Sequence, residues 1–378
     1  MILSTLDKSR KGGAYEQIPS LVLGQRWTPQ LNSRNMMKVV LCVWIEPYIE
    51  NDLSFCVWPV HTPTTSKEVL TLSASTSPLP YTGNKSCIVN TILSVMPKHT
   101  VYIDPCMGSA KVFFRKPRAE KEILNDYNGD LVNLFRVIQN NEKLAYLLGR
   151  LYLSINGELA FKQNKDRLKG VPNILETSQI FYDASWEDIQ NAAAFLENQV
   201  YSFSSTGQTF GIARRDMSQR LPRLMSAYNR IRDAIILHRD YKDVITYAAC
   251  PGSFILLDPP YKGTEDMYSK ANFDIEQHDI LFSFMSEVNQ QHHGEVKFLI
   301  TYNNDPYIRG LAEKHGFDTF VQTRLHSMKQ SKEAGALYEE LLIANYDLEK
   351  QAAANHLYLD EQKSQMTLFD FKTNYTED

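Results

Sequence analysis

An acid, two prolines and an aromatic ring follow a short apolar run in this sequence. The run is Phe254–Leu257, and Asp258, Pro259, Pro260 and Tyr261 come directly after it. Four consecutive apolar residues predict a strand covered on both faces, and the prolines cannot continue its ladder. In an open α/β sheet, side chains at the carboxyl end of a strand lie where ligands bind. The carboxylate and the ring are therefore suited to hold a planar base with an amino group. A simple strand-terminating turn is the alternative.

A second predicted strand end combines an acid with a turn of small residues. The strand over residues 101–103 runs into Asp104, and Gly108 lies in the turn before a helical run. Such a glycine lets a ligand approach the backbone, and the following helix N-terminus offers free N–H groups. Asp126 ends the next predicted strand about 20 residues later, a spacing suited to binding ribose hydroxyls. A helix N-cap explains Asp126 equally well from local sequence.

Arginines gather in the segment that precedes the Asp258 strand. Residues 203–241 hold seven arginines, no lysine and three aspartates, a local charge of +4 in a chain whose formal net charge is -4. A loop rich in Ser, Thr and Gly, with Phe203 and Phe210, adjoins these arginines. The combination suits phosphate contacts and the reading of base edges. A solvated helix face with salt bridges is the alternative.

Hydrophobic periodicity predicts the elements that position these residues. Strand and helix patterns alternate over residues 78–140 and again over 239–347, ending in a strand pair at 317–325 and 340–346. Helical patterns dominate the intervening residues 141–238, at 143–154, 186–199 and 218–237. We therefore predict an α/β sheet that is interrupted by one helical insertion.

The composition narrows the class of protein. A length of 378 residues suits one large domain with a second unit, and the net charge of -4 excludes a uniformly basic nucleic-acid binder. Five scattered cysteines form no zinc-type spacing, so we expect no metal site, and reduced thiols in the cytoplasm. The apolar stretch 39–45 is far too short to span a membrane.

The two ends of the chain differ from the part between them. Residues 1–77 show no chemistry, and we expect a poorly ordered extension, with a small β appendage as the alternative. The tail 348–378 is polar but contains Leu368, Phe369 and Phe371. Such a peptide is suited to docking into a groove on a partner. A segment folded back on the protein's own surface is the alternative.

Five motifs in this order resemble the Dam-type DNA adenine-N6 methyltransferases. The similarity covers roughly residues 78–347, and the motifs together are far more specific than the last one alone. The motifs are Tyr81-x-Gly83-x-Lys85, Asp104-Pro105-x-x-Gly108-x-Ala110, Asn125-Asp126, Asp240-Tyr241 and Asp258-Pro259-Pro260-Tyr261.

The resemblance implies a Rossmann-like catalytic domain over residues 78–140 and 239–347, with a target-recognition insertion at 141–238. It implies S-adenosylmethionine as methyl donor and a flipped adenine in duplex DNA as acceptor. Cytosine-N4 methylation, and a non-catalytic module that binds DNA or a clamp, are the alternatives. The tail peptide Gln365–Phe369, with Gln365, Leu368 and Phe369, resembles the peptide that binds the bacterial sliding clamp.

The same resemblance assigns roles to the predicted site residues. Tyr81 and Lys85 would lie near the methionine end of the cofactor, and Asp104 with the Gly108 backbone would hold its amino and carboxylate groups. Asp126 would bind the ribose, and Asp240 would contact the cofactor's adenine amine. Two departures concern this pocket, because the family usually has Phe where Cys106 stands and often Gly at Met107.

The catalytic residues also make chemical sense for methylation of an amine. The exocyclic nitrogen of adenine is a poor nucleophile because its lone pair is delocalised into the ring. Asp258 and the carbonyl of Pro259 or Pro260, by accepting both N–H bonds, would favour a more tetrahedral and nucleophilic nitrogen. Tyr261 can stack on the flipped base, and the methyl donor then needs only in-line placement, without a metal.

Overall fold

The computed structural model describes residues 77–169, 186–263, 273–325 and 337–363, with residues 82, 84, 86 and 214 left out. Apart from Ser77, the predicted N-terminal extension lies outside the described residues, as does the tail peptide from Gln365 to Phe369. None of the helices in this described part has the length and apolar character that a membrane crossing demands.

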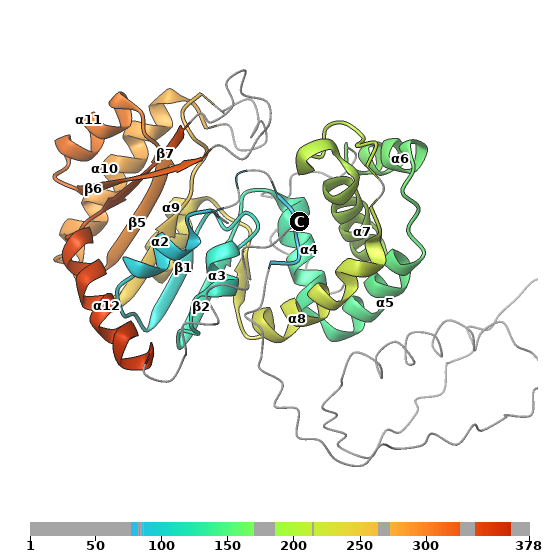
Figure 1. Cartoon of the computed structure of the whole chain (residues 1–378), viewed down its shortest axis with the longest axis horizontal. Coiled ribbons are helices and arrows are strands. Elements are labelled where there is room, and N and C mark those ends of the chain that lie inside the picture. The colour runs from blue at the N-terminus through green and yellow to red at the C-terminus, as the bar shows by residue number, and fades with distance from the viewer. Residues whose placement is uncertain are drawn as a thin grey trace, which may run out of the picture.

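A seven-stranded sheet dominates the described chain (Figure 1). Its order is β3-β2-β1-β4-β5-β7-β6, with the first five strands parallel and β7 antiparallel to both neighbours. The predicted α/β sheet is thus confirmed. The strands are β1 (Val101–Asp104), β2 (Lys121–Asn125), β3 (Ile235–Leu237), β4 (Ser253–Leu257), β5 (Lys297–Asn303), β6 (Asp318–Leu325) and β7 (Leu337–Ala344).

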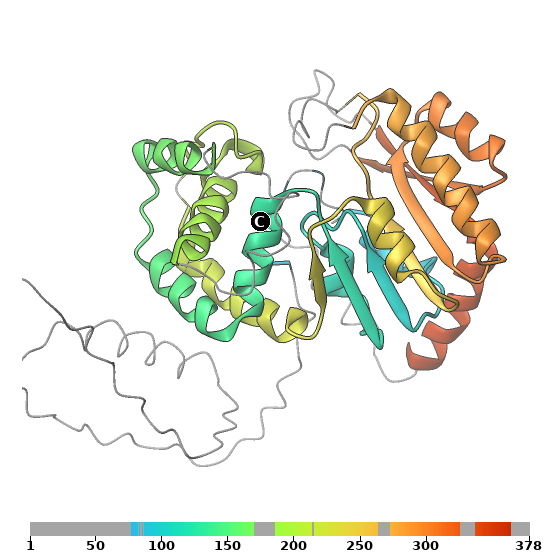
Figure 2. The same ribbon diagram turned by 180° about the vertical axis from the view of Figure 1, so that it is seen from behind.

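Helices cover both faces of the sheet, which explains the continuous apolar run in β4. Phe254 and Leu256 pack into the core on one face, whereas Ile255 and Leu257 pack into the core on the other. Figures 1 and 2 show the two helical layers from opposite sides. The first layer holds α2 (Val89–Ser94), α3 (Lys111–Arg115), α4 (Gly129–Gln139) and α12 (Leu348–Lys363), and the second holds α9 (Tyr241–Ala248), α10 (Ile275–Gln291) and α11 (Pro306–Lys314).

Four acids come together at one edge of the sheet. Asp104 ends β1, Asp126 follows β2, Asp240 comes after β3, and Asp258 follows β4. These strands are parallel neighbours, so their carboxyl ends share an edge. The chain runs outward from β1 to β2 and β3 and then returns to the other side of β1 at β4. Such a switch point is the ordinary ligand site of an open α/β sheet.

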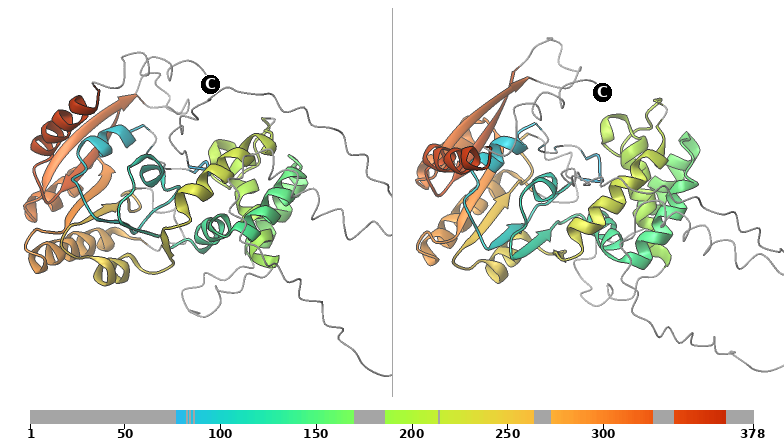
Figure 3. Two further views of the ribbon diagram at one scale, coloured as in Figure 1. Left: turned by 90° about the horizontal axis from the view of Figure 1, so that it is seen from below. Right: turned by 60° about the horizontal axis from the view of Figure 1, so that its bottom comes forward.

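The helices between α4 and β3 form a helical unit beside the β3 edge of the sheet (Figure 3). Its central helix is α7, which contacts α4, α5 and α6 and buries Ala192, Ala193 and Leu196. The helical unit comprises α5 (Asn141–Tyr152), α6 (Glu158–Lys169), α7 (Trp186–Tyr201), η2 (Phe203–Ser205), η3 (Met217–Arg220) and α8 (Leu221–Ile231).

The predicted C-terminal boundary of one helix in this unit was wrong. The pattern over residues 218–237 predicted a continuous helix, but α8 ends at Ile231 and residues Ile235–Leu237 form the edge strand β3. Ile235 pairs with Ile123 of β2. This partner lies more than a hundred residues away, so local periodicity carries no sign of it.

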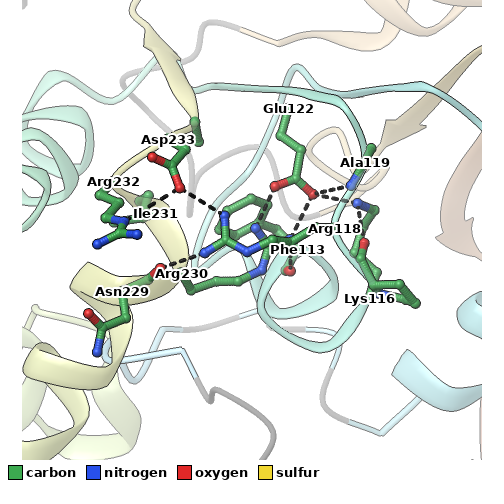
Figure 4. A network of polar contacts seen from close by, with 12 residues as sticks. Phe113, Lys116, Arg118, Ala119, Glu122, Asn229, Arg230, Ile231, Arg232 and Asp233 are labelled. Carbon is green, nitrogen blue, oxygen red and sulfur yellow. Dashed lines mark hydrogen bonds and ion pairs between the residues drawn. The ribbon is translucent and has the colours of Figure 1, made fainter. Parts of the chain in front are cut away.

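A buried ion network fastens the helical unit to the sheet (Figure 4). Arg230 of α8 donates to both carboxylate oxygens of Glu122 in β2 and, through Nη2, to the Phe113 carbonyl at 2.9 Å. Lys116 Nζ lies 2.6 Å from the same Glu122 carboxylate. Although burial raises it, Arg230 and Lys116 hold the pKa of Glu122 below its usual value. One carboxylate is thus matched by two cations.

Candidate active site

A cavity of about 1110 Å³ opens at the carboxyl edge of the sheet, between the sheet and the helical unit. It exceeds the usual volume of a pocket for a small ligand, roughly 300–1,000 Å³. Eight of the ten predicted site residues line it: Tyr81, Lys85, Asp104, Gly108, Asp126, Asp240, Asp258 and Pro260. Pro259 is buried behind this lining, and Tyr261 lies beside Lys85. The cavity therefore combines residues at four strand ends with Tyr81 and Lys85, which precede α2.

One carboxylate oxygen of Asp258 has two partners. Lys85 Nζ lies 2.6 Å from its Oδ1, and the Thr301 hydroxyl of β5 donates to the same oxygen at 2.8 Å. Burial raises the pKa of Asp258, and Lys85 and Thr301 oppose that rise. Thr301 was not among the predicted residues, since nothing in its own surroundings in the sequence distinguishes it.

The hydroxyl of Tyr261 is held by strand β7, which lies two strands from β4 in the sheet. This hydroxyl donates to Glu340 Oε2 of β7 at 2.9 Å, and the Tyr261 ring centroid lies 5.7 Å from that of Tyr302. Lys85 Nζ lies 4.8 Å from the centroid of the Tyr261 ring. One ammonium group therefore occupies the space over the ring and the hydrogen-bonding position on Asp258 at the same time. These are the two places that a stacked, amine-bearing base would need.

Asp104 is nearly inaccessible, and a single hydrogen bond supports its carboxylate among the described residues. The donor is the hydroxyl of Tyr102, 3.0 Å from Oδ2. Burial raises the pKa of Asp104 to about 8, and the nearby charges of Asp258 and Asp126 add to that rise. This carboxylate is held in place without a cation of its own.

Asp126 organises the turn after β1. Its Oδ2 accepts from the backbone N–H of Gly108 at 2.9 Å, and its Oδ1 accepts from the N–H of Asn128 at 2.8 Å. The N-cap of α4 is Asn128 and not Asp126. Gly108 has a φ of +48°, a conformation that favours glycine, and its N–H is already used by Asp126. Burial raises the pKa of Asp126 to about 6.

Asp240 and Asn125 fix the neighbouring loops. Asp240 is the N-cap of α9, and its Oδ1 accepts from the Lys242 N–H at 2.8 Å. The Asn125 amide donates to the carbonyls of Pro105 and Arg239. Cys106 also lines the cavity, at the position where a larger ring was expected. Among the described residues, no group of His, Cys, Asp or Glu side chains is arranged to hold a metal ion.

The helical unit supplies the opposite wall. Phe195, Asn198 and Gln199 of α7 line the cavity, together with Lys165 of α6 and Gln208 of the following loop. The Oδ1 of Asn198 and the Oε1 of Gln199 are buried, and neither has a hydrogen-bond partner in the part of the chain that the structure describes. None of these five residues was predicted to line the site. The two buried amides on α7, Asn198 and Gln199, resemble ordinary core sequence.

The arginines of residues 203–241 separate into different environments. Arg230 is only 7% exposed and forms an ion pair with Glu122. The expectation of phosphate contact is therefore wrong for this residue. Arg232 pairs with Asp233, and Arg215 donates to the Val200 carbonyl. The guanidinium of Arg239 lies 5.8 Å from the centroid of the Tyr247 ring.

Comparison with protein families gives a match over most of the described chain. Residues 81–333 fit the model of the D12 class N6 adenine-specific DNA methyltransferase. This span begins at Tyr81 of the first motif and runs beyond the Asp258–Tyr261 motif.

Curated relatives carry compatible names. A DNA N-6-adenine-methyltransferase of Escherichia phage P1 is 26% identical over 63% of this chain, which spans 31% of that relative. Modification methylase LlaI of Lactococcus lactis subsp. lactis is 22% identical over 73% of this chain and 44% of its own length. The type II methyltransferase M1.LlaDCHI of Lactococcus lactis subsp. cremoris is 21% identical over 70% of this chain and 94% of its own. The chain thus spans less than half the length of the first two relatives and nearly all of the third.

Proposed function

Because the chain belongs to the D12 class N6 adenine-specific DNA methyltransferase family, we propose that it transfers a methyl group from S-adenosylmethionine to N6 of a flipped adenine in duplex DNA. The resemblance to the Dam-type enzymes is confirmed at the level of the family. The family model is specific for adenine, and the cytosine-N4 alternative gains no support from it.

A single arrangement carries the proposal. Asp258 and Tyr261 stand at the carboxyl end of β4, in or beside one cavity that Asp104 and Asp126 share. The amine acceptor Asp258 and the stacking ring of Tyr261 therefore lie next to a charged cofactor pocket. Methyl transfer requires this adjacency, since its main demand on a protein is to hold donor and acceptor in line.

The cavity suits a cationic cofactor. Asp104 is buried and Asp126 and Asp258 are partly buried, and the charge of Asp258 raises the pKa of the other two. Among the described side chains, Lys85 is the only cation within hydrogen-bond distance of any of the three. S-adenosylmethionine, when bound, supplies an electrophilic methyl group on a positively charged sulfur. Asp104 would hold its ammonium group. Asp126 has two of its roughly four acceptor positions left for ribose hydroxyls.

On the acceptor side, Asp258 and a proline carbonyl hold the amino group, and Tyr261 supports the plane of the base. The hydrogen bond to Glu340 keeps the Tyr261 ring from turning. Lys85 must leave the space over Tyr261 when a base enters, because its ammonium group now fills both contacts. The base's own N–H then replaces the Lys85 N–H on Asp258.

The decisive experiment is transfer of a labelled methyl group to unmethylated genomic DNA, followed by mass spectrometry of the nucleosides. N6-methyladenine is the expected product. N4-methylcytosine would overturn the choice of base. Absence of both transfer and S-adenosylmethionine binding by calorimetry would favour a non-catalytic DNA-binding module of the same fold.

We further propose that residues 141–238 select the DNA target, with residues 78–140 and 239–347 as the catalytic domain. The cavity wall from α7 and the loop after it supports this division, because these residues face the catalytic acids. Exchange of the insertion with that of a relative of known specificity should transfer that specificity, as read by mapping methylated adenines.

The tail gives a separate proposal about a partner. We propose that Gln365, Leu368 and Phe369 bind a bacterial sliding clamp, on the basis of their resemblance to clamp-binding peptides. Deleting residues 365–371 should abolish clamp binding in a pull-down with purified clamp and leave methylation of free DNA unchanged. Clamp binding that survives the deletion would refute this contact.

A further inference from the structure

Lys111 lies close enough to Arg115, Arg220 and Arg223 for their positive charges to repel its own. Lys111 and Arg115 belong to α3 of the sheet domain, whereas Arg220 and Arg223 belong to η3 and α8 of the helical unit. We call these four residues the cationic track. Lys111 also lines the catalytic cavity, so the cationic track reaches the cavity rim.

A hollow of about 1140 Å³ lies on the helical side of the cationic track. Arg220 and Arg223 line it together with Arg215, and Phe210 and Ile212 add apolar surface. The Ile212 side chain is 98% exposed. A hollow with several guanidinium groups and an apolar wall has the chemistry for phosphates and deoxyriboses of a nucleic-acid backbone.

The charges of the cationic track are not neutralised within the described residues. None of its four members forms an ion pair there, whereas Arg118 and Arg232 both pair with Asp233. Burial lowers the pKa of Lys111, and repulsion by Arg223, Arg220 and Arg115 lowers it further. Asp216 also lines the hollow, and its Oδ1 accepts from the Ser218 N–H.

From this geometry we infer that the cationic track is a phosphate clamp that grips the backbone of duplex DNA beside the flipped base. The inference rests on the proposed function, since it takes duplex DNA as the polymer that enters the cavity. DNA is favoured because a cluster of like charges reaching the cavity rim matches a continuous polyanion.

The clamp spans two parts of the molecule. Two of its cations are on α3 and two are on the helical unit, so a bound phosphate backbone would screen repulsion across the junction. Each phosphate neutralised releases counterions, which makes affinity fall as salt rises. The cationic track therefore predicts a measurable part of the salt dependence of binding.

The test compares two double variants with equal changes of charge. Arg220→Gln with Arg223→Gln removes half of the cationic track, and Arg118→Gln with Arg232→Gln removes two paired arginines near the same junction. Binding of each protein to fluorescent duplexes of several sequences is measured by anisotropy at different salt concentrations. The slope of log affinity against log salt should fall in magnitude by about 2 in the first variant, or about 1 per phosphate contact.

In the first variant, weakening should be similar for every duplex sequence. The paired control should keep the wild-type slope. An unchanged slope in the first variant, or an equal loss in the control, would overturn the inference. If the double variant is unfolded by circular dichroism, the exposed single change Arg223→Gln should still lower the slope by about 1. Salt-dependent duplex binding by a wild-type protein that transfers no methyl group would overturn the proposed function and leave the clamp standing.

Discussion

The buried charges at the junction and those in the cavity differ in how they are satisfied. At the junction, Glu122 accepts from Arg230, Lys116 and the Ala119 N–H, and its pKa lies below the usual value. In the cavity, burial raises the pKa of Asp104 to about 8.

The difference separates a structural charge from a functional one. A buried carboxylate with enough donors is a permanent part of the fold. A buried carboxylate without a cation is held ready for a ligand that brings one, and it is a candidate site for that reason. Four comparisons between variants break or sharpen the contrast.

The largest effect is expected from Asp258→Ala in the cavity. Methyl transfer should fall by roughly 10²–10⁴-fold, the usual contribution of a group that handles protons in the transition state. S-adenosylmethionine binding should remain, because we propose that Asp258 acts on the acceptor base. Asp243→Ala, an exposed acid on α9, is the matched control and should keep activity. Wild-type turnover in Asp258→Ala would refute the assigned role.

At the junction, Arg230→Met should act on stability. The free energy of unfolding should fall by about 3 kcal/mol, near the lower end for breaking a buried pair, because Lys116 still compensates Glu122. Arg118→Met removes an exposed pair and should cost about 1 kcal/mol or less. Urea unfolding of both variants gives the comparison. Equal losses would show that the buried network is not what fastens the helical unit.

Tyr102→Phe tests how the cavity acid is positioned. The change removes only the hydroxyl that donates to Asp104. The KM for S-adenosylmethionine should rise about tenfold, the value of roughly one hydrogen bond to a charged group, with kcat less affected. Tyr346→Phe removes a buried hydroxyl that donates to the Val95 carbonyl, far from the cavity, and should leave this KM unchanged. A similar rise in both variants would point to a general loss of stability.

Much of the cavity could be predicted because parallel strands place their ends together. The apolar run of β4 and the spacing of Gly108 and Asp126 pointed to two strand ends, and the structure joins Gly108 and Asp126 by a hydrogen bond. Tyr81, Lys85 and Asp240 came from the family resemblance. Residues that support the site from other strands could not be predicted. Glu340 lies far along the chain from Tyr261, and its carboxylate in a buried strand has no local signature.

The arginines show the same limit in another form. Composition predicted a basic segment, but it could not separate Arg230, which pairs with Glu122, from Arg223, which is unpaired in the described part. Only the packing of α8 against β2 and α3 makes that distinction. Lys111 and Arg115 were not considered with these arginines, since they belong to a different part of the sequence.

Replacing a carboxylate by an amide should change the free energy of unfolding in opposite directions in the cavity and at the junction. Asp104 binds a proton in the folded state up to about pH 8, but in the unfolded chain only up to about pH 4. Between these values the folded state holds more protons, so the free energy of unfolding falls as the pH rises. Asp104→Asn cannot ionise. It should raise the melting temperature of the free protein at pH 8, by an amount equivalent to about 1 kcal/mol or more, and flatten the pH dependence.

Glu122→Gln should do the opposite, because its folded pKa lies below the usual value and its ionised form is stabilised. That variant should be less stable than the wild type at pH 8, and the difference should shrink as the pH falls through the range in which Glu122 takes up a proton. Thermal melts of the three proteins from about pH 3 to pH 8 decide the matter, because Glu122 takes up its proton below its ordinary pKa of about 4.3. Destabilisation by both changes at pH 8 would mean that Asp104 is a structural charge like Glu122. A gain from Asp104→Asn would mean that the fold gives up stability to keep an anion in the cavity.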